Sequence, residues 1–164
     1  MPDALRFEAD WTYFQNALDA ADVTLLGRHT HEAAPNARHR RRLVASRGVH
    51  AVIQEDACTW WVNPEEVTPA SAVAVVAGTE AIVAVVGGTG VFDWILEDGG
   101  FESFHLSLAH PVRLGAGRPL FDGVDDLDGA IARLNARNLH AARRDWLDET
   151  AGLELITFEN VGRR

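Results

Sequence analysis

The sequence predicts an α/β domain with a mixed, mostly parallel central sheet that is flanked by helices and ends in an antiparallel hairpin. In the first part of the chain, short apolar runs that stop at glycines alternate with amphipathic segments. The last part contains two strand-like segments joined by a short polar turn. This order of elements is typical of a layered α/β fold.

The first elements follow from periodicity. An amphipathic helix is expected at 10–21, because Trp11, Phe14 and Leu18 recur at spacings of three and four. Asp10 is its expected N-cap. Short apolar runs then predict strands at 23–26, 43–45 and 51–53.

The segment 71–77 is ambiguous, because its Ala and Val residues favour a strand by propensity alone. The run 80–86 is a better strand, since it is β-branched and stops at paired glycines. The remaining expected elements are a helix at 91–96, a strand at 104–108, a helix at 126–138 and two closing strands at 139–146 and 153–159.

Composition and charge exclude several classes of protein. The chain has 164 residues, of which 47% are hydrophobic, and a net charge of −9, the opposite of the bias of a general nucleic-acid binder. The single cysteine, Cys58, cannot form an internal disulfide. The most apolar window, 72–92, is broken by polar residues and glycines, and no signal-peptide pattern opens the chain. A cytoplasmic location is expected.

The first candidate site follows the strand at 23–26 and reads Gly27-Arg28-His29-Thr30-His31-Glu32. A glycine lets the chain turn sharply, and α/β proteins bind ligands at the carboxyl ends of their strands. Arg28 offers a planar guanidinium suited to a phosphate, and Thr30 offers a hydroxyl and an N–H at a helix start. A plain strand-to-helix turn explains the same residues.

Two further glycine-rich segments are candidates. The turn Gly87-Gly88-Thr89-Gly90 lies between an expected strand and an expected helix, where the backbone can approach a pyrophosphate. It is not the Rossmann fingerprint, because Asp93 stands where the third glycine would be. The segment 111–121 carries a Gly-x-Gly pair and is either a surface loop with a site or a structural turn that packs Phe121 on the core.

Taken in order, these segments resemble the dihydrofolate reductase superfamily, especially the reductase domain of the bifunctional riboflavin-biosynthesis deaminase-reductase and its stand-alone relatives. The resemblance covers about residues 10–159. It lies in the order and spacing of Gly27-Arg28-His29-Thr30 with Glu32, Leu43-Val44-Ala45-Ser46-Arg47, Val86-Gly87-Gly88-Thr89-Gly90 and the segment 111–121.

The resemblance implies an NADPH site. It would assign Arg28 to the adenosine-side phosphate and the turn at 87–90 to the nicotinamide and pyrophosphate. It also implies a helix at 71–77 and, in many members of the family, a cis peptide between the first two glycines of that turn. The implied cofactor-binding residues are Gly27, Arg28, His29, Thr30, Ser46, Arg47, Gly87, Gly88, Thr89 and Gly90.

The chain departs from the family pattern at its start. Family members normally begin with a strand and an Asp-Gly-type loop that closes over substrate and nicotinamide, whereas only nine residues precede Asp10 here. Either Met1 is an internal start in a longer chain, or part of the active site is lost. The catalytic residues therefore stay unassigned, and backbone edges would be left unpaired unless another chain covers them.

Other chemistries fit the sequence less well. His29 and His31 would point to different faces of a helix, which argues against a metal site. Cys58 fits a buried thiol better than a nucleophile, and no Gly-x-Ser-x-Gly elbow indicates a serine hydrolase. The basic segment 38–42 is either a solvated loop or a patch that helps with cofactor phosphates.

Two functions remain open for this single expected domain, 1–164. The first is an NADPH-dependent oxidoreductase that transfers a hydride to a small heterocyclic or carbonyl substrate. Arg28 and Arg47 favour NADPH over NADH, because a 2′-phosphate rewards bidentate contacts. The second is a non-catalytic nucleotide-binding or assembly protein. The expected partner is a small-molecule substrate, with no nucleic acid or membrane, and the riboflavin-type reductase domains suggest a homodimer.

Overall fold

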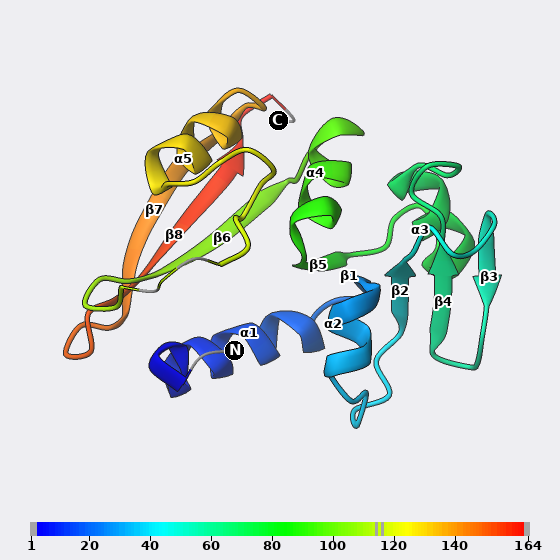
Figure 1. Ribbon diagram of the computed structural model, residues 1–164, viewed down its shortest axis with the longest axis horizontal. Coiled ribbons are helices and arrows are strands. Elements are labelled where there is room, and N and C mark those ends of the chain that lie inside the picture. Colours follow the sequence, from blue (N-terminus) through cyan, green and yellow to red (C-terminus); the bar gives the residue numbers. More distant parts are fainter. Residues whose placement is uncertain (1–2, 114, 116, 163–164) are drawn as a thin grey trace. The chain divides into compact units, whose positions relative to one another are not determined.

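The computed structural model describes residues 3–113, 115 and 117–162 and shows an α/β fold with two separate sheets (Figure 1). One sheet has five mostly parallel strands flanked by helices, and the other has three antiparallel strands. The predicted fold class is therefore confirmed. The chain divides into two compact units: residues 17–98 form one, and the residues before 17 form the other together with those from 99 onward.

The five-stranded sheet has the order β3-β4-β2-β1-β5. Strands β1, β2, β4 and β5 form its parallel part, and β3 pairs antiparallel with β4. The strands are β1 (Val23–Gly27), β2 (Arg42–Ala45), β3 (Val52–Gln54), β4 (Thr59–Val62) and β5 (Val83–Gly87). The helices that pack on this sheet are α2 (Arg28–Ala33), α3 (Pro69–Ala77) and α4 (Thr89–Glu97).

Strand β1 lies inside the sheet, between β2 and β5, and its residues from Val23 to Leu26 are all buried. This explains why the strand reads as a continuous apolar run rather than an alternating one, since both faces of a parallel sheet are covered. Leu43 and Val44 of β2 and Val62 of β4 complete the fully buried core of the sheet.

Helix α3 corrects the interpretation of 71–77 from propensity, which favoured a strand, and agrees with what the resemblance implied. The hydroxyl of Thr68 accepts a hydrogen bond from the Ser71 N–H (3.2 Å), and Pro69 occupies the first turn. A side-chain cap and an N-terminal proline both favour a helix start. Burial of Ala72 and Val76, four residues apart, then outweighs the β preference of valine.

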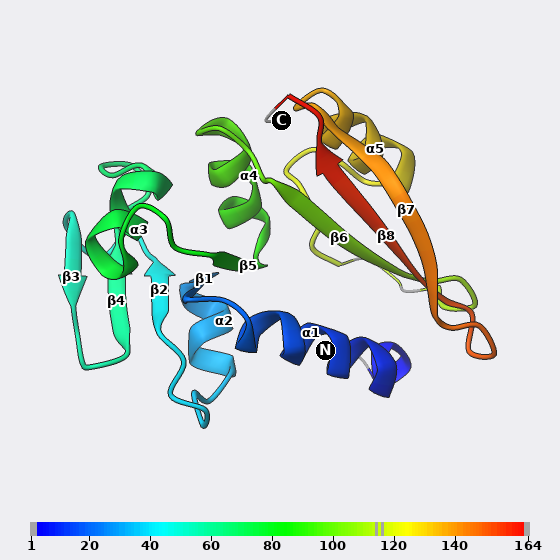
Figure 2. The same cartoon turned by 180° about the vertical axis from the view of Figure 1, so that it is seen from behind.

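The second unit contains a sheet of order β6-β8-β7 in which both pairings are antiparallel (Figure 2). The closing strands form a hairpin through 149–152, as the sequence predicts. The elements are η1 (Asp3–Leu5), α1 (Glu8–Asp19), β6 (Ser103–Ala109), α5 (Leu127–Asn135), β7 (Leu139–Asp148) and β8 (Leu153–Asn160). The last residues of α1, from 17 onward, belong to the unit that contains the five-stranded sheet.

The two amphipathic helices differ in how well the sequence located their starts. The predicted helix at 126–138 starts one residue before α5, and Asp126 caps α5 by accepting from the Gly129 N–H (2.7 Å). The prediction that Asp10 caps α1 is wrong, because the helix already begins at Glu8. The Asp10 carboxylate accepts a hydrogen bond from the Ser107 hydroxyl (2.5 Å) instead.

The glycine-rich segment 111–121 ends in a buried side chain, since Phe121 is fully buried against Phe104. This supports its interpretation as a structural turn; residues 114 and 116 lie outside the described residues. Among the described helices, none is long and apolar enough to cross a membrane.

Candidate nucleotide site at the edge of the five-stranded sheet

The three sequence segments singled out above meet at one edge of the five-stranded sheet. In the strand registers Gly27 lies opposite Ala45, and Leu26 lies opposite Gly87, so β1, β2 and β5 end at the same level. The residues that follow these strands therefore emerge together at their carboxyl ends. This is the edge where parallel α/β sheets bind their ligands.

Gly87 is required by the local geometry. Its φ is +106°, and a Cβ at this position would stand 2.7 Å from Cζ of Phe92, well inside van der Waals contact. The peptide between Gly87 and Gly88 is trans, unlike the cis form that the resemblance implied. The sharp turn into α4 is made by positive φ angles at both glycines.

Gly88 and Gly90 leave open space at the start of α4. Gly88 is the N-cap, with a φ of +93° and no side-chain cap, and a Cβ at either glycine would meet nothing within 4 Å. The first turn of the helix carries no acidic residue. Because the start of a helix carries the positive end of its dipole, this surface can accept an anionic group at close range.

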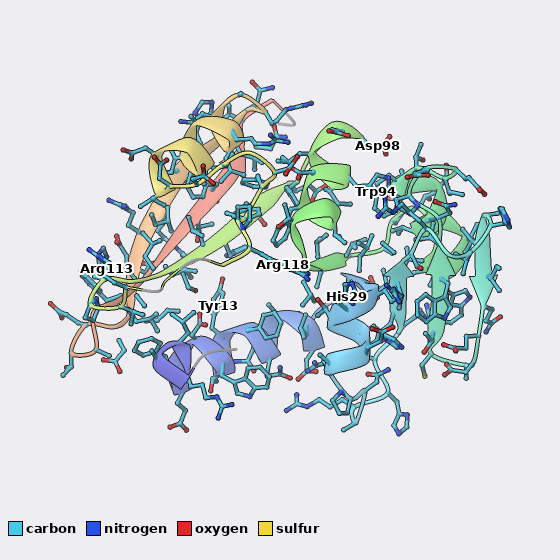
Figure 3. The ribbon with its side chains drawn as sticks, viewed as in Figure 1. Tyr13, His29, Trp94, Asp98, Arg113 and Arg118 are labelled. Carbon is cyan, nitrogen blue, oxygen red and sulfur yellow. The ribbon has the colours of Figure 1, made fainter. Side chains whose placement is uncertain are left out.

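The segment after β1 places Arg28 and His29 on the surface of α2. His29 is labelled in Figure 3. Arg28 Nη1 lies 3.5 Å from Glu32 Oε1, and His29 Nδ1 lies 3.5 Å from Glu32 Oε2. All three side chains are more than half exposed. Exposed ion pairs of this kind contribute little to the stability of the fold. Arg28 can therefore leave Glu32 and bind a phosphate with little loss of free energy. Thr30 follows on the same turn and is half-buried.

The segment after β2 contributes Ser46 and Arg47. The Ser46 N–H extends the sheet by donating to the Val62 carbonyl (2.9 Å), and its hydroxyl accepts from the Gly48 N–H (3.2 Å). The Arg47 side chain is 78% exposed and lies 3.8 Å from Glu65 Oε1. A hydroxyl and an exposed guanidinium therefore lie at this end of the sheet.

The basic segment 38–42 lies at the amino end of β2, the opposite edge from these residues. Arg38 and Arg40 both bind Asp19, and the hydrogen bond from Arg40, with the charges of both arginines, holds the pKa of Asp19 below its ordinary value. Arg42 donates to the Ala34 carbonyl (2.8 Å). These contacts anchor the chain before β2, so we leave the segment out of the candidate site.

The unit with the three-stranded sheet holds a polar cluster that the sequence analysis missed. The hydroxyl of Tyr13, which is labelled in Figure 3, lies 2.7 Å from Nδ1 of His105. The Ser103 hydroxyl lies 3.2 Å from Nε2 of the same ring. Desolvation raises the pKa of Tyr13, whereas desolvation and the charge of Arg143 lower the pKa of His105. A protonated phenol thus faces a neutral imidazole, which has one accepting and one donating nitrogen.

This cluster had a signal in the sequence. Asp10 and Tyr13 are three apart in α1, and Ser103, His105 and Ser107 alternate along β6, so each set lies on one face of its element. Two contacts join the faces, Tyr13 to His105 and Asp10 to Ser107. Among the described residues, no group of three or more His, Cys, Asp and Glu side chains is arranged to hold a metal ion.

No protein-family model matches the chain, and no curated protein matches it either.

Proposed function

We propose that the chain is an NADPH-dependent reductase of a small heterocyclic or carbonyl substrate, with the nucleotide held at the carboxyl edge of the five-stranded sheet. The observation that carries this proposal is the convergence of three separate segments, 27–30, 46–47 and 87–90, at that edge. When bound, NADPH supplies the hydride, while the chain binds and orients the nucleotide.

The donor groups at this edge suit the phosphates of a dinucleotide. Arg28 and Arg47 are exposed guanidiniums without buried partners, and such groups bind phosphate bidentately. The hydroxyls of Thr30, Ser46 and Thr89 lie on the same three turns. Local positive charge matters in this chain, because a net charge of −9 repels an anionic ligand elsewhere on the surface.

The glycines suit the close approach of a pyrophosphate. The open space beside Gly88 and Gly90 would be filled by any larger residue, whereas Gly87 is fixed by Phe92 for the fold alone. In this turn the fold requires Gly87, whereas a ligand would require Gly88 and Gly90. The start of α4 adds the positive end of the helix dipole to this surface.

A second candidate is a nucleotide-binding or assembly protein without hydride transfer. The composition of the site favours it: the ten candidate residues are four glycines, two threonines, a serine, two arginines and a histidine. These are groups that bind phosphate. Both proposed functions require a bound nucleotide, and they differ only in whether its hydride is transferred to a substrate.

Titration with NADPH and NADH, followed by quenching of the fluorescence of the five tryptophans, tests both candidates. Trp94 lies on α4, the helix that begins at the proposed site. We expect saturable binding of NADPH with a clear preference over NADH, and the absence of binding by a folded sample would overturn the proposal. Loss of NADPH absorbance with a panel of heterocyclic and carbonyl compounds then distinguishes a reductase from a binding protein.

A further inference from the structure

The loops that follow β2 and β4 lie side by side. The two strands are parallel neighbours, with Ala45 opposite Val62 in their register. Each loop carries a charged side chain just beyond the strand end, and Nη1 of Arg47 lies 3.8 Å from Oε1 of Glu65. Both side chains are largely exposed, 78% for Arg47 and 67% for Glu65.

The backbone beneath this pair is fixed by Asn63, which is only 5% exposed. Its amide nitrogen donates to the Val49 carbonyl (3.0 Å) and to Oε1 of Glu66 (3.1 Å). Its amide oxygen accepts from the Glu65 N–H (3.0 Å). One side chain thus ties the loop that carries Arg47 to the turn that carries Glu65.

Glu66 strengthens the same connection. Its Oε2 accepts from the Ala51 N–H (2.9 Å), and its Oε1 lies 3.0 Å from Nδ1 of His50. The Ala51 N–H, followed by His50, lowers the pKa of Glu66 below its ordinary value, so the carboxylate stays ionised as these contacts require. The two loops therefore share a hydrogen-bonded base, from which the side chains of Arg47 and Glu65 extend as an exposed pair.

We infer that Glu65 sets the cofactor specificity by competing with the 2′-phosphate of NADPH for Arg47; this inference rests on the proposed nucleotide site. A guanidinium binds a phosphate bidentately, whereas a carboxylate paired with the same guanidinium has to be displaced first and can accept from a free ribose hydroxyl. Glu65 thereby lowers the affinity of the chain for NADPH, while NADH can still bind. The exposed ion pair is weak enough for a phosphate to displace it.

Glu65→Gln tests the inference, because it removes the charge and keeps the size of the side chain. We expect the Kd for NADPH to fall about threefold to tenfold, the range for one screened charge at close distance. The Kd for NADH stays the same or rises slightly, so the preference for NADPH increases. Glu80→Gln is the matched control, since it removes an equal charge from the exposed turn before β5.

A second pair of variants tests whether Glu65 acts through Arg47. In the Arg47→Ala background, Glu65→Gln has little further effect on NADPH affinity if the two groups compete as inferred. An undiminished effect in that background, or equal results for Glu65→Gln and Glu80→Gln, overturns the inference and leaves the nucleotide site standing. Failure of the folded wild-type chain to bind either nucleotide overturns the proposed function and the inference together.

Discussion

Gly27 and Gly87 end two neighbouring parallel strands so close together that a Cβ on Gly27 would stand 3.9 Å from the carbonyl oxygen of Gly87. The same Cβ would stand 3.5 Å from Cγ2 of Val91 on α4. Both are ordinary van der Waals distances, so the turn into α2 lies directly beside the turn into α4. Two of the three segments of the proposed site are therefore neighbours at the level of their backbone.

Replacing Gly87 with alanine should destabilise the protein. The new Cβ would collide with the ring of Phe92, and the residue would keep a φ of +106° that alanine adopts poorly. We expect a loss of about 2–4 kcal/mol in the free energy of unfolding, measured by urea denaturation. Unchanged stability would contradict the geometry of this turn.

Gly90→Ala provides the opposite test at the same turn. Its Cβ meets nothing within 4 Å, and alanine is favoured over glycine inside a helix by about 0.5–1 kcal/mol. The variant should therefore fold at least as well as the wild type yet bind NADPH more weakly, because the methyl group occupies the space assigned to the nucleotide. Full retention of binding would exclude the nucleotide from this surface.

Arg28→Ala should weaken the binding of NADPH much more than the binding of NADH. Loss of a charged hydrogen-bond donor to a phosphate corresponds to about tenfold or more in affinity, and only NADPH carries the 2′-phosphate. Fluorescence titration of the variant with both nucleotides measures the two losses. Equal losses would remove Arg28 from the role of reading that phosphate.

Tyr13 offers a spectroscopic test of the second unit, because it is the only tyrosine in the chain. Desolvation raises its pKa above the ordinary value of 10.0, so its phenol should ionise at higher pH in the folded chain than in urea. The stabilising contribution is present below the unfolded value and is lost as the pH rises through the folded one. Absorbance titration of folded and denatured samples measures both, and coincident midpoints would contradict the desolvation of this phenol in the folded chain.

Glu66→Gln should change how stability depends on pH on the acid side. The pKa of Glu66 in the folded chain lies below its ordinary value of 4.5, so its contribution is present above that value and is lost as the pH falls through the folded one. The difference in stability between wild type and variant should therefore shrink on acidification. Denaturation at a series of pH values measures it, and a constant difference would contradict the contacts with Ala51 and His50.

The sequence predicted the elements better than their contacts. Strands β1, β2 and β5 were found because glycines or polar residues stop short apolar runs. Helix α3 was misread from propensity, although Thr68 just before it and Pro69 in its first turn are helix-start signals. The role of Asp10 could not be predicted, because its partner Ser107 is distant in the sequence and is supplied by another element.

The candidate site was predictable as three turns but not as pairs of side chains. Strand order is needed to bring Arg47 next to Glu65, since the parallel pairing of β2 with β4 sets the contact. Likewise, His105 reaches Tyr13 across 92 residues only when β6 lies against α1. Local patterns specify elements, whereas such contacts depend on register and topology.

The contrast between Asn63 and its two exposed neighbours bears on how the protein can evolve. Aspartate could not replace Asn63 without placing a second acceptor against the Val49 carbonyl and the Glu66 carboxylate, so selection for a stable chain should keep the amide. Arg47 and Glu65 are free of that constraint and can drift. If Arg47 and Glu65 read the nucleotide as proposed, one or two surface substitutions are enough to change the cofactor preference between lineages while the scaffold beneath them stays the same.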